Sequence, residues 1–462
     1  MSTSFSACAG CSQRDTLIER LQARLAELEA ENARLRLQGE TNAREQARQA
    51  NRFRRRQLKK RRKKPGRKRG HIAAVRPTPT PDRIIDVPLP QCPDCQAPLY
   101  NRGSVRQFQT DLPPIVPVVT QFNIQTGYCT CCQRYRQGRH PEQVSDAIGS
   151  AGNTLGPVIL TMAAELKHRL GVPYRKICDF FATYYDLEIC PATFARAEQR
   201  LTNKALPTYQ LLLDALRRAH VVHADETGWR IGRLNAWLWV FSSKDTTVYV
   251  IRRSRGRDVP DDILGTAFDG YLVVDGLKVY DVFEVAKGRC NAHLLRRCKE
   301  LAGTLPNAEI RHVHALGKLI QQAIKLAERR PQLASAIYTR RVEKIEHALD
   351  AWLDRVPLNG SRDLDRLVNH VASHRGEWLV FLHDAEVPPT NNHAEQMIRP
   401  AVITRKVGGC NKTLLGAVVH GVLASLMVTC KRQGRRFLDL AKRLWHAEET
   451  PAIPLDSLPV ET

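Results

Sequence analysis

The spacing of hydrophobic positions changes several times along the chain, and each change marks a different expected element. Over residues 18–35 apolar side chains recur at alternating steps of three and four, the heptad spacing of a coiled coil. An asparagine, Asn32, takes one core position, which favours a single register and a dimer. The pattern predicts a leucine zipper over residues 15–40 and self-association through it. The alternative is an amphipathic helix that packs on its own chain. The heptad positions are Ile18, Leu21, Leu25, Leu28, Asn32 and Leu35.

Helical spacing returns over residues 155–170 and 174–185, and a third helix is expected to begin at Pro191. Short breaks separate these segments, as in a helix-turn-helix-like cluster. We therefore expect a helical domain over residues 150–218. The pattern leaves open whether this domain touches DNA or packs beneath the next one.

From residue 221 the pattern becomes strand-rich. Strands are expected over residues 221–225, 236–241, 247–251 and 271–275, with a short helix near 259–264 and a fifth strand over 282–286. This order suits a mixed sheet of ribonuclease-H-like kind. Helices are then expected over 313–329, 333–353 and 364–382. The expected fold class is α+β and multidomain, with a catalytic domain at 219–445, a helical insertion at about 305–385 and a tail at 446–462.

Charge changes this picture more than overall composition does. The 462 residues are 43% hydrophobic, which is ordinary, but the net charge of +24 is not. Such a charge makes nucleic acid the first partner to consider. No stretch is apolar for the about 18 residues that a membrane span needs. No secretory signal is visible at the start of the sequence, so we expect a cytoplasmic protein without a membrane partner.

Much of that charge lies in one segment. Residues 1–70 hold 20 Lys and Arg against 7 Asp and Glu, so 13 of the 24 net charges lie there. Clustered cations bind the phosphate backbone with little sequence preference. Residues 44–90 are therefore expected to be a DNA-contacting segment that ends in a Pro-rich linker; a solvated tail is the alternative. The expected DNA contacts are Arg52, Arg54, Arg55, Arg56, Lys59, Lys60, Arg61, Arg62, Lys63, Lys64, Arg67, Lys68 and Arg69.

The thirteen cysteines include two Cys-x-x-Cys pairs, which are Cys92 with Cys95 and Cys129 with Cys132. This spacing lets two thiolates bind one tetrahedral Zn²⁺, so residues 91–145 are expected to form a four-cysteine zinc-binding ribbon. Residues 116–124 are expected to supply one of its strands. The alternatives are two incidental turns or a thiol redox site.

Three carboxylates are placed as metal ligands usually are. Asp225 and Asp275 each follow a short apolar strand and precede a glycine, and Glu395 lies near the start of a helix. Gly228 is expected to allow a turn after the first strand. If the three carboxylates converge, they repel one another unless cations lie between them. The expectation is therefore a Mg²⁺ or Mn²⁺ site that suits phosphoryl transfer.

Each carboxylate has an alternative. Glu226 rivals Asp225, while Asp269 and Asp281 rival Asp275. Asn392 and Glu395 have the spacing of a capping box, so Glu395 could serve the helix alone. Cys290 and His293 make half of a zinc site, but no second pair is evident, and a packed pair beside the active site is the preferred interpretation.

Several motifs together resemble the insertion-sequence 66 family of bacterial DDE transposases. They are residues 223–229 (HADETGW), 270–276 (GYLVVDG), 290–293 (CNAH), Asn391-Asn392 with Glu395, and Arg399-Pro400 with Arg405-Lys406. The resemblance extends over about residues 15–445, including the zipper, basic segment, cysteine pairs and helices. The chain departs from the expected pattern at Gln396 and at residues 407–410.

The resemblance implies a ribonuclease-H-like domain whose catalytic triad is Asp225, Asp275 and Glu395, with Mg²⁺ or Mn²⁺ as cofactor. Arg399, Arg405 and Lys406 would meet the charge of the DNA phosphates. Double-stranded DNA, as element ends and as target, would be the partner of a homodimer or higher oligomer at the bacterial nucleoid. The alternatives are a zinc-containing DNA-binding regulator with an inactive domain, and a nuclease that cuts without joining.

Overall fold

The computed structural model describes Glu27, Glu29 and Glu31, which are helical, and residues 78–100, 103, 105–113, 115–357 and 361–460. Apart from those three glutamates, the expected zipper lies outside the described residues, and so does the whole expected cluster of DNA-contacting cations. The chain divides into two compact units, residues 1–114 and 115–462.

In the first unit, the described residues from 78 to 113 contain neither helix nor strand, and Cys92 and Cys95 lie in a turn. The carbonyl of Cys92 accepts the N–H of Gln96 at 2.9 Å, and the N–H of Cys92 donates to Ala97 at 3.1 Å. Gln96 has a left-handed φ of 58°. These bonds close a tight loop around the two thiols.

The second unit begins with a hairpin of β1 (Thr126–Cys129) and β2 (Arg134–Gln137). The strand expected over residues 116–124 is absent, so that prediction was wrong. Val116 and Val118 are exposed. The hairpin carries Cys129 and Cys132 at its turn.

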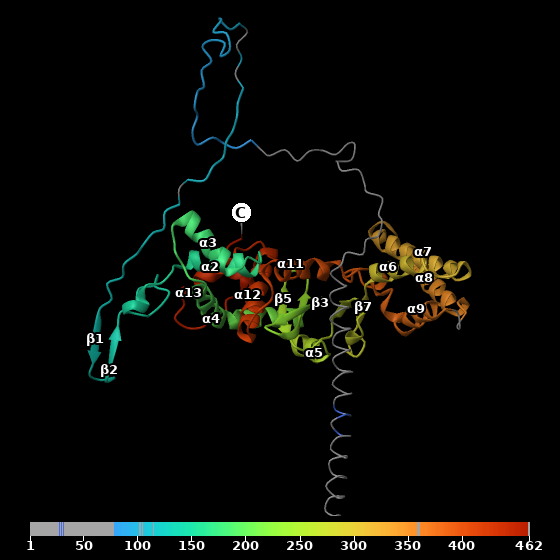
Figure 1. The fold of residues 1–462 in the computed structure, drawn as a ribbon. Coiled ribbons are helices and arrows are strands. Elements are labelled where there is room, and N and C mark those ends of the chain that lie inside the picture. Colours follow the sequence, from blue (N-terminus) through green and yellow to red (C-terminus); the bar gives the residue numbers. More distant parts are fainter. Residues whose placement is uncertain are drawn as a thin grey trace, which may run out of the picture. The chain divides into compact units, whose positions relative to one another are not determined.

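A mixed sheet of five strands forms the centre of this unit (Figure 1), in the order β5-β4-β3-β6-β7. The first three strands are antiparallel, while β6 and β7 run parallel to β3. The predicted mixed sheet is confirmed. Its strands are β3 (Val221–Ile231), β4 (Leu234–Ser242), β5 (Thr247–Arg252), β6 (Tyr271–Val274) and β7 (Lys287–Arg289), with α5 (Asp258–Leu264) between β5 and β6.

Two strand predictions were wrong in detail. β3 does not turn at Gly228, which pairs with Trp237 inside the ladder; the strand continues to Ile231 and turns at Gly232, where φ is +59°. The last strand is β7 instead of residues 282–286, which are irregular. The sequence of β7 is Lys-Gly-Arg and has no apolar pattern that could predict a strand. Its buried side chain is Arg289, which pairs with the carboxylates of Asp281 and Glu377.

One face of the sheet shares a hydrophobic core with helices from both ends of the unit. On β4, Trp239 and Phe241 join this core, while Leu238 and Val240 face a second core under α11. The alternation is that of a strand covered on both faces. The helices of the first core include α2 (Pro157–His168), α3 (Tyr174–Tyr185), α4 (Pro191–Arg217), α12 (Leu414–Arg432) and α13 (Phe437–His446).

The helix α12 is long and apolar enough to cross a membrane by length and composition alone. Within this unit, however, 67% of its apolar window is buried, against β5 and α4 among other elements. Its hydropathy is explained by this position in the core.

Residues 305–385 are mainly helical and gather around a third core beside β7 (Figure 1). The helix expected over 364–382 is interrupted at His374 by a 3₁₀ turn, η4 (Arg375–Glu377). After this region, α11 (Asn392–Gly408) packs against β3 and β4 of the sheet. The other helices of this region are α6 (Asn291–Leu301), α7 (Asn307–Glu328), α8 (Ser335–Arg355), α9 (Arg362–Ser373) and α10 (Val380–His383).

Candidate active site

Asp225 and Asp275 lie at the same end of two neighbouring parallel strands. His223 on β3 pairs with Val273 on β6, and each aspartate stands two residues further along its chain. The Oδ1 atom of Asp225 accepts the N–H of Glu226 at 2.8 Å. The Oδ1 atom of Asp275 accepts the N–H of Leu277 at 2.9 Å, so Asp275 sits in a turn directly after its strand.

Asn391 attaches the start of α11 to β3. Its side chain is 1% exposed; Oδ1 lies 2.9 Å from Nδ1 of His223, and Nδ2 donates to the carbonyl of Ala224 at 2.8 Å. Its backbone N–H donates to Sγ of Cys290 at 3.1 Å. Because Glu395 is one helical turn further on, these bonds bring it beside the strand that carries Asp225. The sequence motif contained Asn391, but no role for it could be read there.

The three carboxylates act on one another electrostatically. Burial raises the pKa of Asp225 to about 7, and the nearby charges of Glu226, Asp275 and Glu395 add to the rise. The N–H of Glu226 opposes it only in part. The charges of Asp275 and Glu395 therefore reach Asp225, although the three residues are far apart in the sequence. Negative charge gathered in this way favours a bound cation.

The rival carboxylates are already engaged elsewhere. Glu226 accepts a bond of 2.7 Å from Arg255 and one of 3.3 Å from the hydroxyl of Tyr280. Asp281 pairs with the buried Arg289 and lies 3.2 Å from Nε2 of His374. Asp269 precedes β6 and so stands at the opposite end of that strand from Asp275. These positions favour Asp225 and Asp275 as the pair that faces Glu395.

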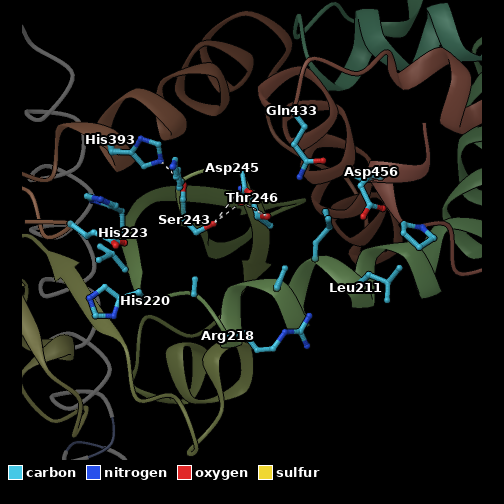
Figure 2. Close-up of a pocket in the computed structure, with 18 of the residues that line it drawn as sticks. Leu211, Arg218, His220, His223, Ser243, Asp245, Thr246, His393, Gln433 and Asp456 are labelled. Carbon is cyan, nitrogen blue, oxygen red and sulfur yellow. Dashed lines mark hydrogen bonds between the residues drawn. The ribbon is translucent and has the colours of Figure 1, made fainter. Parts of the chain in front are cut away.

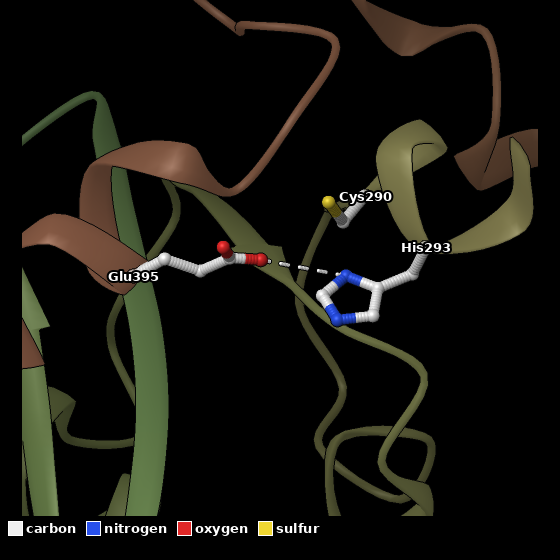
Figure 3. Close-up of side chains that lie close together, drawn as sticks. All are labelled: Cys290, His293 and Glu395. Atoms are coloured by element: carbon white, nitrogen blue, oxygen red, sulfur yellow. Dashed lines mark ion pairs between the residues drawn. The ribbon is translucent and has the colours of Figure 1, made fainter. Parts of the chain in front are cut away.

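Glu395 does not act as a helix cap. The N-cap of α11 is Asn391, and no side-chain capping bond forms there. Glu395 therefore falls one residue beyond the capping-box position, and its carboxylate points instead to His293, with 3.8 Å between Oε1 and Nδ1 (Figure 3). His293 is in the first turn of α6, whose N-cap is Cys290.

Basic side chains on α11 differ in direction. Residues 399 and 406 follow Glu395 at steps of 4 and 11, which places them on its face of the helix, and both are exposed. Arg405 points the other way. It donates to Oγ1 of Thr227 at 3.0 Å and to the carbonyl of Gly228, and its burial lowers its pKa. Arg405 therefore holds α11 to β3, while Arg399 and Lys406 face outward.

A cavity of about 1210 Å³ opens near this site without containing the carboxylates (Figure 2). It lies among α4, the turn between β4 and β5, the start of α11 and residues 453–456, and His223 and His393 line it. Burial lowers the pKa of His223 to about 4, although its bond to Asn391 opposes the shift. His223 is therefore neutral at physiological pH.

The two cysteine pairs have the same local conformation. Gln133, after the second pair, has a φ of 52° and so matches Gln96 after the first. The N–H of Cys132 lies 3.4 Å from Sγ of Cys129. Backbone N–H groups lower the pKa of Cys92 and of Cys129, which favours the thiolate form that binds metal. The two pairs belong to different units, and a shared zinc ion stays a prediction.

Comparison with known proteins decides the family. Residues 152–419, more than half of the chain, match the family described as "Transposase IS66 family". The chain belongs to the IS66 family of transposases. The matched segment includes Asp225, Asp275 and Glu395, together with Cys290 and His293.

Three curated proteins of Sinorhizobium fredii are related to this IS66-family chain, and each is described as uncharacterized. Protein y4jO is 26% identical over 161 residues, which is 34% of this chain and 45% of that protein. Protein y4qI is 26% identical over 285 residues, or 54% and 51% of the two chains. Protein y4jD is 24% identical over 392 residues, or 77% and 74%. The chain thus spans about half the length of the first two relatives.

Proposed function

We propose that this chain is a DNA transposase that cleaves the ends of an insertion sequence and joins them to target DNA. Membership of the IS66 family indicates a transposase-type, DNA-processing function. The finer proposal rests on one observation: Asp225 and Asp275 lie at the same end of two neighbouring parallel strands, and Asn391 attaches the helix of Glu395 to the first of them. Burial and the neighbouring charges raise the pKa of Asp225 to about 7, which supports it. Such a shift at a clustered site is typical of a functional centre.

The donor set fits a divalent cation of Mg²⁺ or Mn²⁺ type, because Asp225, Asp275 and Glu395 offer oxygen ligands only. When bound, such ions activate the attacking oxygen and stabilise the leaving one. The chain itself would position these three ligands: Asp225 lies on β3, Asp275 directly follows β6, and Glu395 lies on α11. Arg399 and Lys406, exposed on the same face of α11, would bind the phosphate backbone of the DNA.

A strand-transfer assay tests this proposal. The full chain, Mg²⁺ and a duplex carrying the element end should yield a cleaved strand and then a joined product. Asp225→Asn, Asp275→Asn and Glu395→Gln should each lower both steps by about 10²- to 10³-fold or more, since both use the same ligands. Asp269→Asn, at the other end of β6, is the matched control and should keep the rate.

Other outcomes identify the alternatives. Cleavage without a joined product would make the protein a nuclease. Specific DNA binding without cleavage, with all three carboxylates in place, would make it a regulator. A folded Glu395→Gln variant with nearly normal joining would overturn the assignment of Glu395.

We also propose that Cys92, Cys95, Cys129 and Cys132 bind one Zn²⁺, supported by the shared turn conformation of the two pairs. Cys95→Ser and Cys132→Ser should each lower the zinc content of the full chain by the same one ion. A loss in only one of the two variants would contradict a shared site.

The expected zipper suits a protein that must hold two element ends together. We propose that the chain acts as a homodimer or higher oligomer at the bacterial nucleoid. Replacing both Leu21 and Leu28 with proline should leave monomers, which light scattering of the full chain would detect. Unchanged oligomers would assign the contact to another surface.

A further inference from the structure

A second set of metal-ligating side chains lies beside the three carboxylates and shares one of them. Sγ of Cys290, a ring nitrogen of His293 and a carboxylate oxygen of Glu395 all lie within 4.8 Å of one another (Figure 3). Cys290 and His293 come from the start of α6, and Glu395 comes from α11. The pair that looked like half a metal site in the sequence thus gains a third ligand in the fold.

The imidazole of His293 points into the space between the other two ligands. Its Nδ1 atom is buried, and its ring interacts with the thiol of Cys290. The nearest carboxylate oxygen, Oε1 of Glu395, is 3.8 Å away, too far for a hydrogen bond. A separation of about 3.4 Å is what two ligands have on one tetrahedral ion with bonds of about 2.1 Å, so a small movement would complete a site.

The chemistry of these ligands differs from that of the neighbouring triad. A thiolate, an imidazole and a carboxylate together suit Zn²⁺, whereas Mg²⁺ prefers oxygen ligands alone. Cys290 is 2% exposed and receives the N–H of Asn391, so its sulfur is held in place. The side chains of His293 and Glu395 are 36% and 40% exposed, which leaves an entry path and a fourth position for water.

We propose that Cys290, His293 and Glu395 form a zinc site that inhibits the enzyme by drawing Glu395 away from Asp225 and Asp275. A carboxylate held by zinc on the α6 side is not available to complete the oxygen-ligand set on the β3 side. Zinc and the catalytic cations therefore compete for one side chain. The inhibition rests on the function proposed above, but zinc binding at these residues does not.

Equilibrium dialysis of the full, metal-free chain against buffered Zn²⁺ tests the binding. Cys290→Ser and His293→Gln should each bind one zinc ion fewer per chain than the wild type. Cys298→Ser is the matched control, because its thiol is also buried on α6 but lies outside the cluster. His293 is only half-buried, so its variant guards against misfolding of the Cys290 variant. Equal zinc contents in wild type, Cys290→Ser and His293→Gln would overturn the site.

Inhibition is measured on cleavage of element-end DNA at fixed Mg²⁺, with each variant referred to its own zinc-free rate. The free Zn²⁺ that halves the rate should rise by roughly 10- to 100-fold in Cys290→Ser and His293→Gln, and stay unchanged in Cys298→Ser. Equal inhibition of all four proteins would place the inhibitory zinc elsewhere and overturn the proposal. So would binding at the cluster without inhibition. If the wild type cleaves nothing at any zinc concentration, the proposed function fails, and the dialysis still decides the site.

Discussion

The candidate active site and a second buried cluster differ in what surrounds their buried carboxylates. In the second cluster, Nε2 of His168 on α2 lies 3.0 Å from Oε2 of Glu198 on α4, and both side chains are almost fully buried. The hydroxyl of Tyr174 donates to the same oxygen, and His420 on α12 lies 2.9 Å from the other nitrogen of His168. Oε2 of Glu198 is therefore met by two donors, while its Oε1 has no hydrogen-bond partner among the described residues. Asp225 is surrounded by other carboxylates.

This difference is the one expected between a cluster that stabilises the fold and the site proposed above for catalysis. The network around Glu198 joins three helices to α12, and so fastens the N-terminal helices to the C-terminal part of the core. Burial and the neighbouring carboxylates disfavour the ionised form of Asp225, so this side chain destabilises the fold once it is charged. Proteins keep such arrangements where activity requires them.

The largest expected effect on stability is at the paired cluster. Glu198→Ala should lower the free energy of unfolding by about 3–5 kcal/mol, because it leaves His168 and Tyr174 buried without their acceptor. Urea unfolding measures this loss. Glu165→Ala is the control, since it removes a partly exposed partner of Arg169 and should cost at most about 1 kcal/mol. Similar losses in the two variants would end the distinction between the clusters.

Substitution of Asp225 is expected to raise the free energy of unfolding above pH 7, whereas substitution of Glu198 lowers it. In metal-free protein the raised pKa of Asp225 means that, between about pH 4 and pH 7, the folded chain retains a proton that the unfolded chain has released. The free energy of unfolding should therefore fall as pH rises through that window and stay low above it. Asp225→Asn should remove this dependence and be more stable than wild type at pH 8 by about 2–4 kcal/mol.

Urea unfolding at pH 5 and pH 8 in the presence of a chelator checks this prediction, with Asp269→Asn as the control. A variant no more stable than wild type at pH 8 would mean that burial and the neighbouring carboxylates do not raise the pKa of Asp225.

Addition of Mg²⁺ should reverse the repulsion. At a Mg²⁺ concentration 100 times its dissociation constant, the wild type should gain about 2.7 kcal/mol, because the ion binds only the folded chain. Asp225→Asn and Asp275→Asn should gain much less, and Glu198→Gln should gain as much as the wild type. Thermal unfolding with and without Mg²⁺ compares them. Stabilisation of the Asp variants equal to that of the wild type would place the ion elsewhere.

The smallest expected effect concerns the edge of the paired cluster. Trp229 stacks on His420 and donates from Nε1 to Oδ1 of Asn411 at 2.9 Å. A double-mutant cycle of Trp229→Phe and Asn411→Ala should give a coupling of about 1 kcal/mol, the usual value of one such bond. A coupling near zero would show that the ring is held by stacking alone.

The sequence predicted the elements whose apolar pattern is strong. The start of β3, the strand β4, the helix at 174–185, the start of the next helix at Pro191 and the strand before Asp275 all lie where the periodicity places them. It did not predict β7, because the side chain that fixes this strand is a buried arginine whose carboxylate partners come from elsewhere in the chain. The strand expected over residues 116–124 did not form, although its apolar residues alternate, and Val116 and Val118 are exposed.

In the candidate site, too, some residues could be predicted from the sequence and others could not. The three carboxylates could be chosen from strand ends, glycines and a helix start. Their anchors could not, because Asn391, Arg255 and Arg405 act through partners as far as 178 residues away. Asparagine and arginine are common on surfaces, and no local pattern separates these from the rest. The role of Cys290 and His293 likewise depended on a third ligand that only the fold brings to them.

The order of the three carboxylates along the chain has a consequence for synthesis. A ribosome adds about 5–20 residues per second, so roughly 6–24 seconds separate residue 275 from residue 395. During that interval the nascent chain already contains the basic N-terminal segment and both strand-borne aspartates, but no glutamate to complete them. A newly made chain therefore carries its cationic segment well before it can hold a full set of ligands. The bonds from Asn391 that fix α11 on β3 can form only after that interval, so the site is completed late in synthesis.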